Sequence, residues 1–80
     1  MDDIIYRIRE EYTSEQISYG VEIWENSVQI EYIPNVFTEK EYAERLVDNC
    51  NKYQASPIHI YDIIENMYFE IKNTANPSPL

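Results

Sequence analysis

The spacing of apolar side chains changes once along the chain, and this change constrains the fold more than any other feature. Up to about residue 37 apolar residues recur at every second position, which is the period of a strand with one buried face. Beyond that point they recur every three to four positions, which is the period of an amphipathic helix. The sequence therefore predicts a sheet half followed by a helical half.

Three strands are expected in the sheet half, and the lengths of their connections predict the register. A four-residue loop at 13–16 predicts the pairs Tyr6–Ile23, Ile8–Val21 and, on the outer face, Arg7–Glu22. A two-residue turn at Glu25 and Asn26 predicts the pairs Ile23–Val28, Val21–Ile30 and Tyr19–Tyr32 on one face. The strands would form an antiparallel meander.

The first helix is expected to start with a capping box. Thr38 would be the N-cap with Glu41 three residues later, and Phe37 would pack onto Tyr42. The predicted buried stripe is Ala43, Leu46, Val47 and Cys50. The predicted i,i+4 ion pairs on the exposed side are Lys40–Glu44, Glu41–Arg45 and Asp48–Lys52.

The second helix is expected to start with Ser56 as N-cap and Pro57 at the first helical position. Its predicted stripe is Ile60, Ile63, Ile64, Met67, Tyr68 and Ile71. The short connection between the helices predicts an αα-hairpin over the apolar face of the meander, an α+β fold of order β-β-β-α-α. We expect residues 1–73 to form one domain and residues 74–80 a disordered tail containing prolines.

Charge and composition exclude several classes of function. Fifteen acidic against six basic residues, a net charge of −9, disfavour direct binding to nucleic acid or to anionic membranes. One cysteine and one histidine can form neither a disulfide nor a tetrahedral zinc site within the chain. Without a spanning apolar run or a basic N-terminal signal, we expect a cytoplasmic protein with no cofactor.

The two side chains best suited to catalysis lack recognisable partners. His59 has no Ser or Cys nucleophile in a triad arrangement, so a capping or packing role is expected. Cys50 belongs to the predicted apolar stripe and should be a buried, inert thiol. The sequence predicts a protein that is not an enzyme, with a hydrolase or isomerase built on His59 as the alternative.

The outer face of the meander is one candidate surface for a partner. The predicted register places Glu22, Gln29 and Glu31 there, near Trp24. Two further acids, Glu10 and Glu11, flank the neighbouring turn. Aromatic side chains are enriched in protein-binding hot spots. The alternative is that the tail or a second copy of the chain covers this face.

The second helix carries another candidate surface. Tyr61, Asp62, Glu65 and Phe69 are predicted to lie on the side away from its apolar stripe. They would dock a partner or another copy, or else the first helix or the tail would cover them.

Four segments of the chain form a recognisable set: YGVEI (19–23), TEKE (38–41), Leu46-Val47 followed by Cys50-Asn51, and SPIHIYDIIE (56–65). Together they resemble a family of short bacterial proteins of unknown function. The resemblance covers residues 17–66, and only its Ser-Pro-Ile-His part is distinctive. It implies a bacterial or phage origin and supplies neither catalytic residues nor a substrate.

The leading hypothesis is an acidic, non-enzymatic module that docks onto a basic protein surface. Its most specific version is an inhibitor that mimics nucleic-acid charge and blocks a basic nucleic-acid-binding enzyme, as phage inhibitors of CRISPR or restriction systems do. The alternative is a cytoplasmic adaptor or regulator that binds through its aromatic patches, to another protein or as a homodimer. High salt separates the two, because only contacts between charges are strongly screened.

Overall fold

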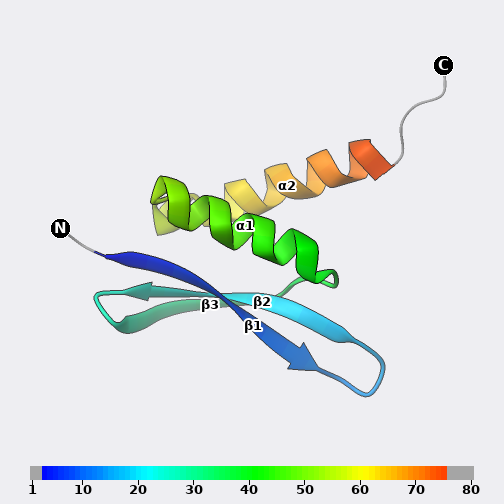
Figure 1. Cartoon of the computed structure of the whole chain (residues 1–80), viewed down its shortest axis with the longest axis horizontal. Coiled ribbons are helices and arrows are strands. Elements are labelled where there is room, and N and C mark those ends of the chain that lie inside the picture. Colours follow the sequence, from blue (N-terminus) through cyan, green and yellow to red (C-terminus); the bar gives the residue numbers. More distant parts are fainter. Residues whose placement is uncertain (1–2, 76–80) are drawn as a thin grey trace.

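The computed structural model describes residues 3–75 as three strands followed by two helices (Figure 1). The elements are β1 (Ile4–Tyr12), β2 (Ile17–Glu25), β3 (Val28–Phe37), α1 (Lys40–Tyr53), the short 3-10 helix η1 (Pro57–His59) and α2 (Ile60–Ala75). The sheet order is β1-β2-β3 with both pairs antiparallel, and both helices lie on the same side of it (Figure 1). The predicted α+β meander followed by two helices is confirmed.

The end of the last helix lies slightly beyond the predicted domain boundary. α2 continues to Ala75, whereas the tail was predicted to start at residue 74. The rest of the predicted tail lies outside the described residues. Within residues 3–75, neither helix combines the length and the hydropathy that crossing a membrane requires.

The pairing of β1 with β2 is the predicted one. The partners include Tyr6–Ile23, Arg7–Glu22 and Ile8–Val21. Thr13 closes the connecting loop, because its N–H donates to the Gln16 carbonyl (2.9 Å) and its hydroxyl oxygen accepts from the Gln16 N–H (3.1 Å). These bonds set the loop length from which the register was predicted.

The turn between β2 and β3 differs from the prediction. It lies at Asn26 and Ser27, which have left-handed φ values of 50° and 71°, and Glu25 pairs with Val28. Positive φ at both central residues is typical of the type I′ hairpin turn, whose twist matches that of the flanking strands. The prediction of a turn at Glu25 and Asn26 was wrong by one position.

A bulge at Ile30 changes the register further. Trp24 pairs with Gln29 and Ile23 pairs with Glu31, so Ile30 has no partner opposite it. Because side chains alternate between the two faces of a strand, the extra residue exchanges the faces of the residues that follow. The predicted pairs Ile23–Val28, Val21–Ile30 and Tyr19–Tyr32 are therefore wrong.

The exchange of faces has a clear physical benefit. Ile30, which was predicted to be inside, is 46% exposed, and Val28, which precedes the bulge and pairs with Glu25 at the turn, is 61% exposed. A second register shift lies between Ile33 and Phe37, and beyond it the end of β3 buries Val36 and Phe37 against the helices. Burial of apolar surface favours this register at roughly 25 cal/mol per Å².

The core lies between the sheet and the helices. The buried side chains are Tyr6, Val21, Ile23, Val36, Phe37, Ala43, Leu46, Val47, Cys50, Ile60, Ile64 and Met67. The predicted stripe of α1 is confirmed in full. In the stripe of α2, Ile63 and Ile71 are partly buried, whereas Tyr68 is 45% exposed.

The single glycine of the chain lies where β3 passes close to β2. A Cβ at Gly20 would lie 2.5 Å from the Tyr32 hydroxyl oxygen and 2.7 Å from the Ile33 carbonyl oxygen. The second contact involves backbone, which cannot move aside as a flexible side chain can. Gly20 is therefore required by close approach.

The outer edge of β1 is closed by side chains from the end of α1. The Asn51 amide accepts a hydrogen bond from the Tyr6 N–H (2.8 Å) and donates one to the Tyr6 carbonyl (2.9 Å). Gln54, which has left-handed φ, donates to the Ile4 carbonyl at 3.5 Å. Asn51 thus reproduces the paired bonds of a neighbouring strand and blocks pairing with another chain at this point.

The predicted capping box at the start of α1 is not formed. The N-cap is Glu39 rather than Thr38, and no side chain caps the helix. Burial of Phe37 keeps the backbone extended through Glu39, which delays the helix by one residue. The predicted contact of Phe37 with Tyr42 is confirmed, with ring centroids 5.9 Å apart.

The predicted i,i+4 ion pairs of α1 are also not found in the described part of the chain. Lys40 lies 3.9 Å from Glu10 on β1, and Arg45 lies 3.1 Å from Glu70 on α2. Exposed pairs of this kind contribute between zero and about 1 kcal/mol. Helical spacing alone therefore does not decide which carboxylate a long basic side chain reaches.

The second helical segment begins where predicted but with a tighter first turn. Ser56 is the N-cap and Pro57 the first residue, yet they open η1, and α2 starts at Ile60. The Ser56 carbonyl accepts from the His59 N–H (2.9 Å), while the Ser56 side chain makes no capping bond.

Candidate partner-binding surfaces

The Glu22 carboxylate on the open face of the sheet is already paired within the chain. It accepts hydrogen bonds from Arg9 Nε (2.6 Å) and from Trp24 Nε1 (2.8 Å). The bond from Trp24 and the bond and charge of Arg9 hold the pKa of Glu22 below its ordinary value. Glu22 was predicted to face a partner, but its charge is largely neutralised where it lies.

The aromatic rings of the open face are covered by arginines of the same chain. The Arg7 guanidinium lies 5.3 Å from the centroid of the Trp24 ring, and that of Arg9 lies 4.0 Å from the Tyr32 ring. Both are cation–π contacts. Trp24 was predicted to need cover from a partner, a second copy or the tail, and Arg7 provides part of that cover.

The bulge at Ile30 separates two acceptors that were predicted to lie together. Gln29 remains on the open face, where its Oε1 accepts from the Arg9 guanidinium at 3.2 Å. Glu31 turns to the helix side and accepts from the Tyr61 hydroxyl at 2.5 Å. The predicted grouping of Glu31 with Glu22 on one face was wrong, because the prediction assumed an unbroken alternation along β3.

The acids near the end of β1 occupy separate positions as well. Glu10 accepts from the Tyr12 hydroxyl and lies 3.9 Å from Lys40 Nζ on α1. Glu11 accepts from the Asn35 backbone N–H at 3.3 Å. Glu11 therefore lies on the open face with Arg9 and Glu22, whereas Glu10 lies on the helix side near Lys40.

The outward side of α2 carries a group of exposed aromatic and acidic residues. Tyr61 and Phe69 are 59% and 68% exposed, and Asp62 and Glu65 are exposed between them. Helical spacing predicted this placement, and α1 does not cover it. Tyr61 reaches Glu31 on β3. We call Glu31, Tyr61, Asp62, Glu65 and Phe69 the α2 surface.

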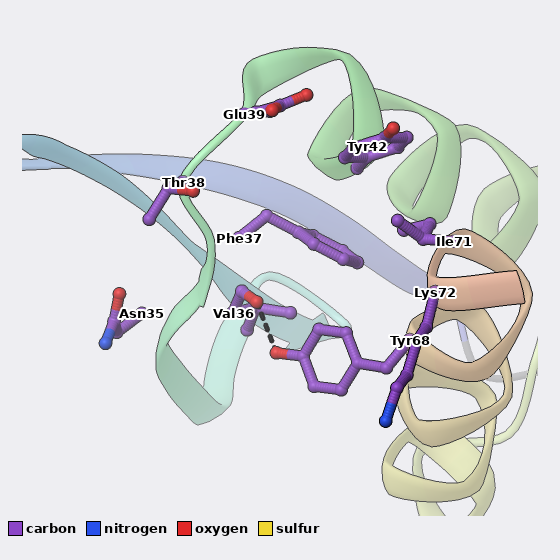
Figure 2. A pocket seen from close by; sticks show the side chains of 9 residues that line it. All are labelled: Asn35, Val36, Phe37, Thr38, Glu39, Tyr42, Tyr68, Ile71 and Lys72. Atoms are coloured by element: carbon purple, nitrogen blue, oxygen red, sulfur yellow. Dashed lines mark hydrogen bonds between the residues drawn. The ribbon is translucent and has the colours of Figure 1, made fainter. Parts of the chain in front are cut away.

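A groove adjoins the C-terminal end of α2 (Figure 2). It has a volume of about 480 Å³ and is lined by Asn35, Val36, Phe37, Thr38, Glu39, Tyr42, Tyr68, Ile71 and Lys72. The Phe37 ring lies edge-on to the Tyr68 ring with centroids 5.3 Å apart. The Tyr68 hydroxyl donates to the Val36 carbonyl, so the aromatic floor presents mainly carbon (Figure 2).

The groove and the partial exposure of Tyr68 were not predicted from the sequence. Its spacing placed Tyr68 in the buried stripe, and only the ring follows that pattern, since the hydroxyl reaches the end of β3. Burial raises the pKa of Tyr68 above its ordinary value. No local signal in the sequence places α2 beside the end of β3.

Neither of the two candidate catalytic side chains belongs to the α2 surface or lines the groove. Cys50 is buried, as predicted, and burial raises the pKa of its thiol to about 11. His59 is exposed on η1 rather than packed. Within the described residues no group of three His, Cys, Asp or Glu side chains is placed to hold a metal ion.

Comparison with known proteins places the chain in a family. No curated protein and no solved structure matches it. A family model matches residues 3–70, so the match extends through β1, beyond the residues 17–66 on which a resemblance was noted. The predicted membership in a family of unknown function is confirmed. The chain belongs to the family of unknown function DUF6514.

Proposed function

We propose that this protein is a non-enzymatic binding module that docks onto a basic protein surface through the α2 surface. The observation that carries the proposal is the exposure of Tyr61 and Phe69 beside three carboxylates. Exposed aromatic rings cost free energy in water, and aromatic side chains are enriched at the cores of protein interfaces. Carboxylates around them select a partner that carries positive charge.

The open face of the sheet is a less favourable binding surface than the α2 surface, because its groups already have partners within the chain. There the rings of Trp24 and Tyr32 already lie beneath arginines, and Glu22 is already paired. On the α2 surface, the side chains of Asp62, Glu65 and Phe69 make no ion pair, hydrogen bond or ring contact with other described residues. A partner gains more by covering groups that the chain has left uncovered.

The narrower prediction of a nucleic-acid mimic stays a prediction. Such a mimic needs carboxylates spaced along one face so that they can replace phosphates. The geometry does not favour it, because Glu22 and Glu31 lie on opposite sides of the sheet and Glu22 is neutralised. The predicted cytoplasmic location and the bacterial or phage origin also stay predictions.

The test starts from a partner captured from the lysate of an organism that encodes the chain. The affinity of that partner, once purified, is then measured for the wild type, for Phe69→Ala and for Tyr53→Ala. Tyr53 is the matched control, since it is an exposed aromatic residue (71%) at the C-terminal end of α1 and is not part of the α2 surface. We expect Phe69→Ala to weaken binding at least tenfold, the loss typical of a hot spot of about 1.4 kcal/mol or more, and Tyr53→Ala to leave it unchanged.

Salt concentration separates this proposal from a pure charge mimic. Raising salt from 0.05 to 0.5 M should weaken binding to the α2 surface by a moderate factor, because aromatic contacts remain when charges are screened. A mimic of nucleic acid would lose nearly all its affinity over that range. Equal loss of affinity in Phe69→Ala and Tyr53→Ala would contradict the proposal.

A further inference from the structure

The open face of the sheet shows how this chain accommodates an arginine. The Arg9 guanidinium lies 2.6 Å from a Glu22 oxygen and 4.0 Å from the centroid of the Tyr32 ring. A planar guanidinium satisfies both groups at once, because it hydrogen-bonds in its plane and stacks through its faces. The pair of a ring and a carboxylate therefore forms a complete arginine site here.

The α2 surface offers the same two kinds of group. Glu65 precedes Phe69 by four residues, which places the two side chains side by side on the helix. Tyr61 is held against the Glu31 carboxylate at 2.5 Å, and more than half of the Tyr61 side chain is exposed. In the part of the chain that the structure describes, no cation lies over Tyr61 or Phe69.

From this likeness we propose that the α2 surface binds arginine side chains of a partner protein, with one guanidinium at Phe69 and Glu65 and another at Tyr61 and Glu31. The inference rests on the proposed function and names the partner's chemistry. The surface carries three carboxylates and no base of its own, so it favours a cation. The rings favour arginine over lysine, because an ammonium group does not stack on a ring as a guanidinium does.

A different protein fits this surface better than a second copy of the chain. Two copies would each bring a net charge of −9, and this like charge opposes association. Of the two arginines on the open face, Arg9 is already paired with Glu22. A partner segment rich in arginine brings the opposite charge and meets no such opposition.

The test uses three short peptides with uncharged ends. Each peptide has the same test residue at two positions, separated by two glycines. One carries arginine, the second lysine, and the third citrulline, which keeps the shape of arginine without its charge. Each is titrated into the full chain labelled with ¹⁵N, and binding is followed by amide chemical shifts. We expect the arginine peptide to bind roughly threefold or more tightly than the lysine peptide, the size of an exposed cation–π effect, and citrulline not to bind.

Two variants and their controls locate the site. Phe69→Leu keeps an apolar side chain but removes the ring, and Glu65→Gln removes the charge. Each substitution should lower the affinity of the chain for the arginine peptide about threefold or more. Tyr53→Leu and Glu44→Gln, at exposed positions on α1, should leave it unchanged.

Three results would overturn the inference. They are equal affinity for arginine and lysine, shifts centred outside residues 58–72, and self-association of the chain at the concentrations used, measured by sedimentation. Failure of this inference differs from failure of the proposed function. If Phe69→Ala lowers the affinity for the captured protein partner while the chain binds the arginine and lysine peptides equally, the α2 surface binds a partner, but by contacts other than arginine side chains.

Discussion

The Tyr61 hydroxyl donates a hydrogen bond to the Glu31 carboxylate at 2.5 Å, joining the first turn of α2 to the middle of β3. This bond raises the pKa of Tyr61 above its ordinary value, because a charged acceptor favours the protonated phenol. It also places Glu31 beside the exposed residues of α2 rather than beside Glu22. The bulge at Ile30 makes this possible, and so links the register of the sheet to the composition of the α2 surface.

Gly20→Ala should destabilise the protein by roughly 1–3 kcal/mol, the usual effect of an added methyl group in a fully packed site. The new Cβ would lie 2.7 Å from the Ile33 carbonyl oxygen, which belongs to the backbone. Urea unfolding of the variant and the wild type measures the difference. Unchanged stability of Gly20→Ala would mean that β3 does not cross β2 this closely.

Glu22→Gln should change how stability depends on acid pH. The folded pKa of Glu22 lies below its ordinary value of 4.5, so ionised Glu22 stabilises the fold above that pH. This stabilisation is lost as the pH falls through the lowered pKa. The difference in unfolding free energy between wild type and Glu22→Gln should therefore be constant near neutral pH and shrink below pH 4.5.

Urea unfolding at several values between about pH 3 and pH 7 checks this dependence, since the window must bracket the ordinary pKa of a glutamate. Glu44→Gln, at an exposed position of α1, is the control for removing a charge without a partner. A pH-independent difference for Glu22→Gln would show that its bonds to Arg9 and Trp24 are not maintained in solution.

Asn51→Ala should both destabilise the protein and open the edge of β1. The variant leaves the N–H and the carbonyl of Tyr6 without the side-chain amide that pairs them, which costs roughly 1–3 kcal/mol. An open edge also favours pairing between chains. Sedimentation should then show concentration-dependent dimers for Asn51→Ala. Asn49→Ala, at an exposed position on α1, is the control and should stay monomeric. If both variants are monomers, Asn51 does not prevent pairing at this edge.

The Cys50 thiol should react with alkylating reagents only when the protein opens. It is 2% exposed, and burial raises its pKa to about 11, so little thiolate is present near neutral pH. Labelling with iodoacetamide at pH 8 should be slow in native protein and should accelerate with added urea in step with unfolding. Rapid labelling of the native protein would contradict the burial of this side chain.

The first pair of strands, the stripe of α1 and the stripe of α2 except Tyr68 could be predicted because local rules determine them. Alternation, loop length and helical spacing are properties of short segments, and the pairs of β1 with β2 follow from them. The register of β3 could not be predicted in this way. The register of β3 depends on the bulge at Ile30 and on a second shift between Ile33 and Phe37, which together allow the end of the strand to bury Val36 and Phe37 against helices that come later in the chain.

The candidate surfaces show the same division. Helical spacing alone predicted that four side chains of α2 are exposed, and the structure confirms it for Tyr61, Asp62, Glu65 and Phe69. The predicted placement of Glu31 on the outer face with Glu22 was wrong because it assumed an unbroken register along β3. The contacts of Arg7 and Arg9 with the rings of Trp24 and Tyr32 were not predicted, since a pattern of charges does not show which ring a flexible side chain covers.

The most direct test of the central claim is the footprint of the captured partner on the chain. Amide chemical shifts of the labelled chain, recorded with and without the purified partner, show which residues it contacts. The largest changes should fall in residues 58–72 and at Glu31, and should be small on the outer face of β1 and β2. A footprint centred instead on Arg7, Glu22 and Trp24 would contradict the assignment of the α2 surface as the binding site.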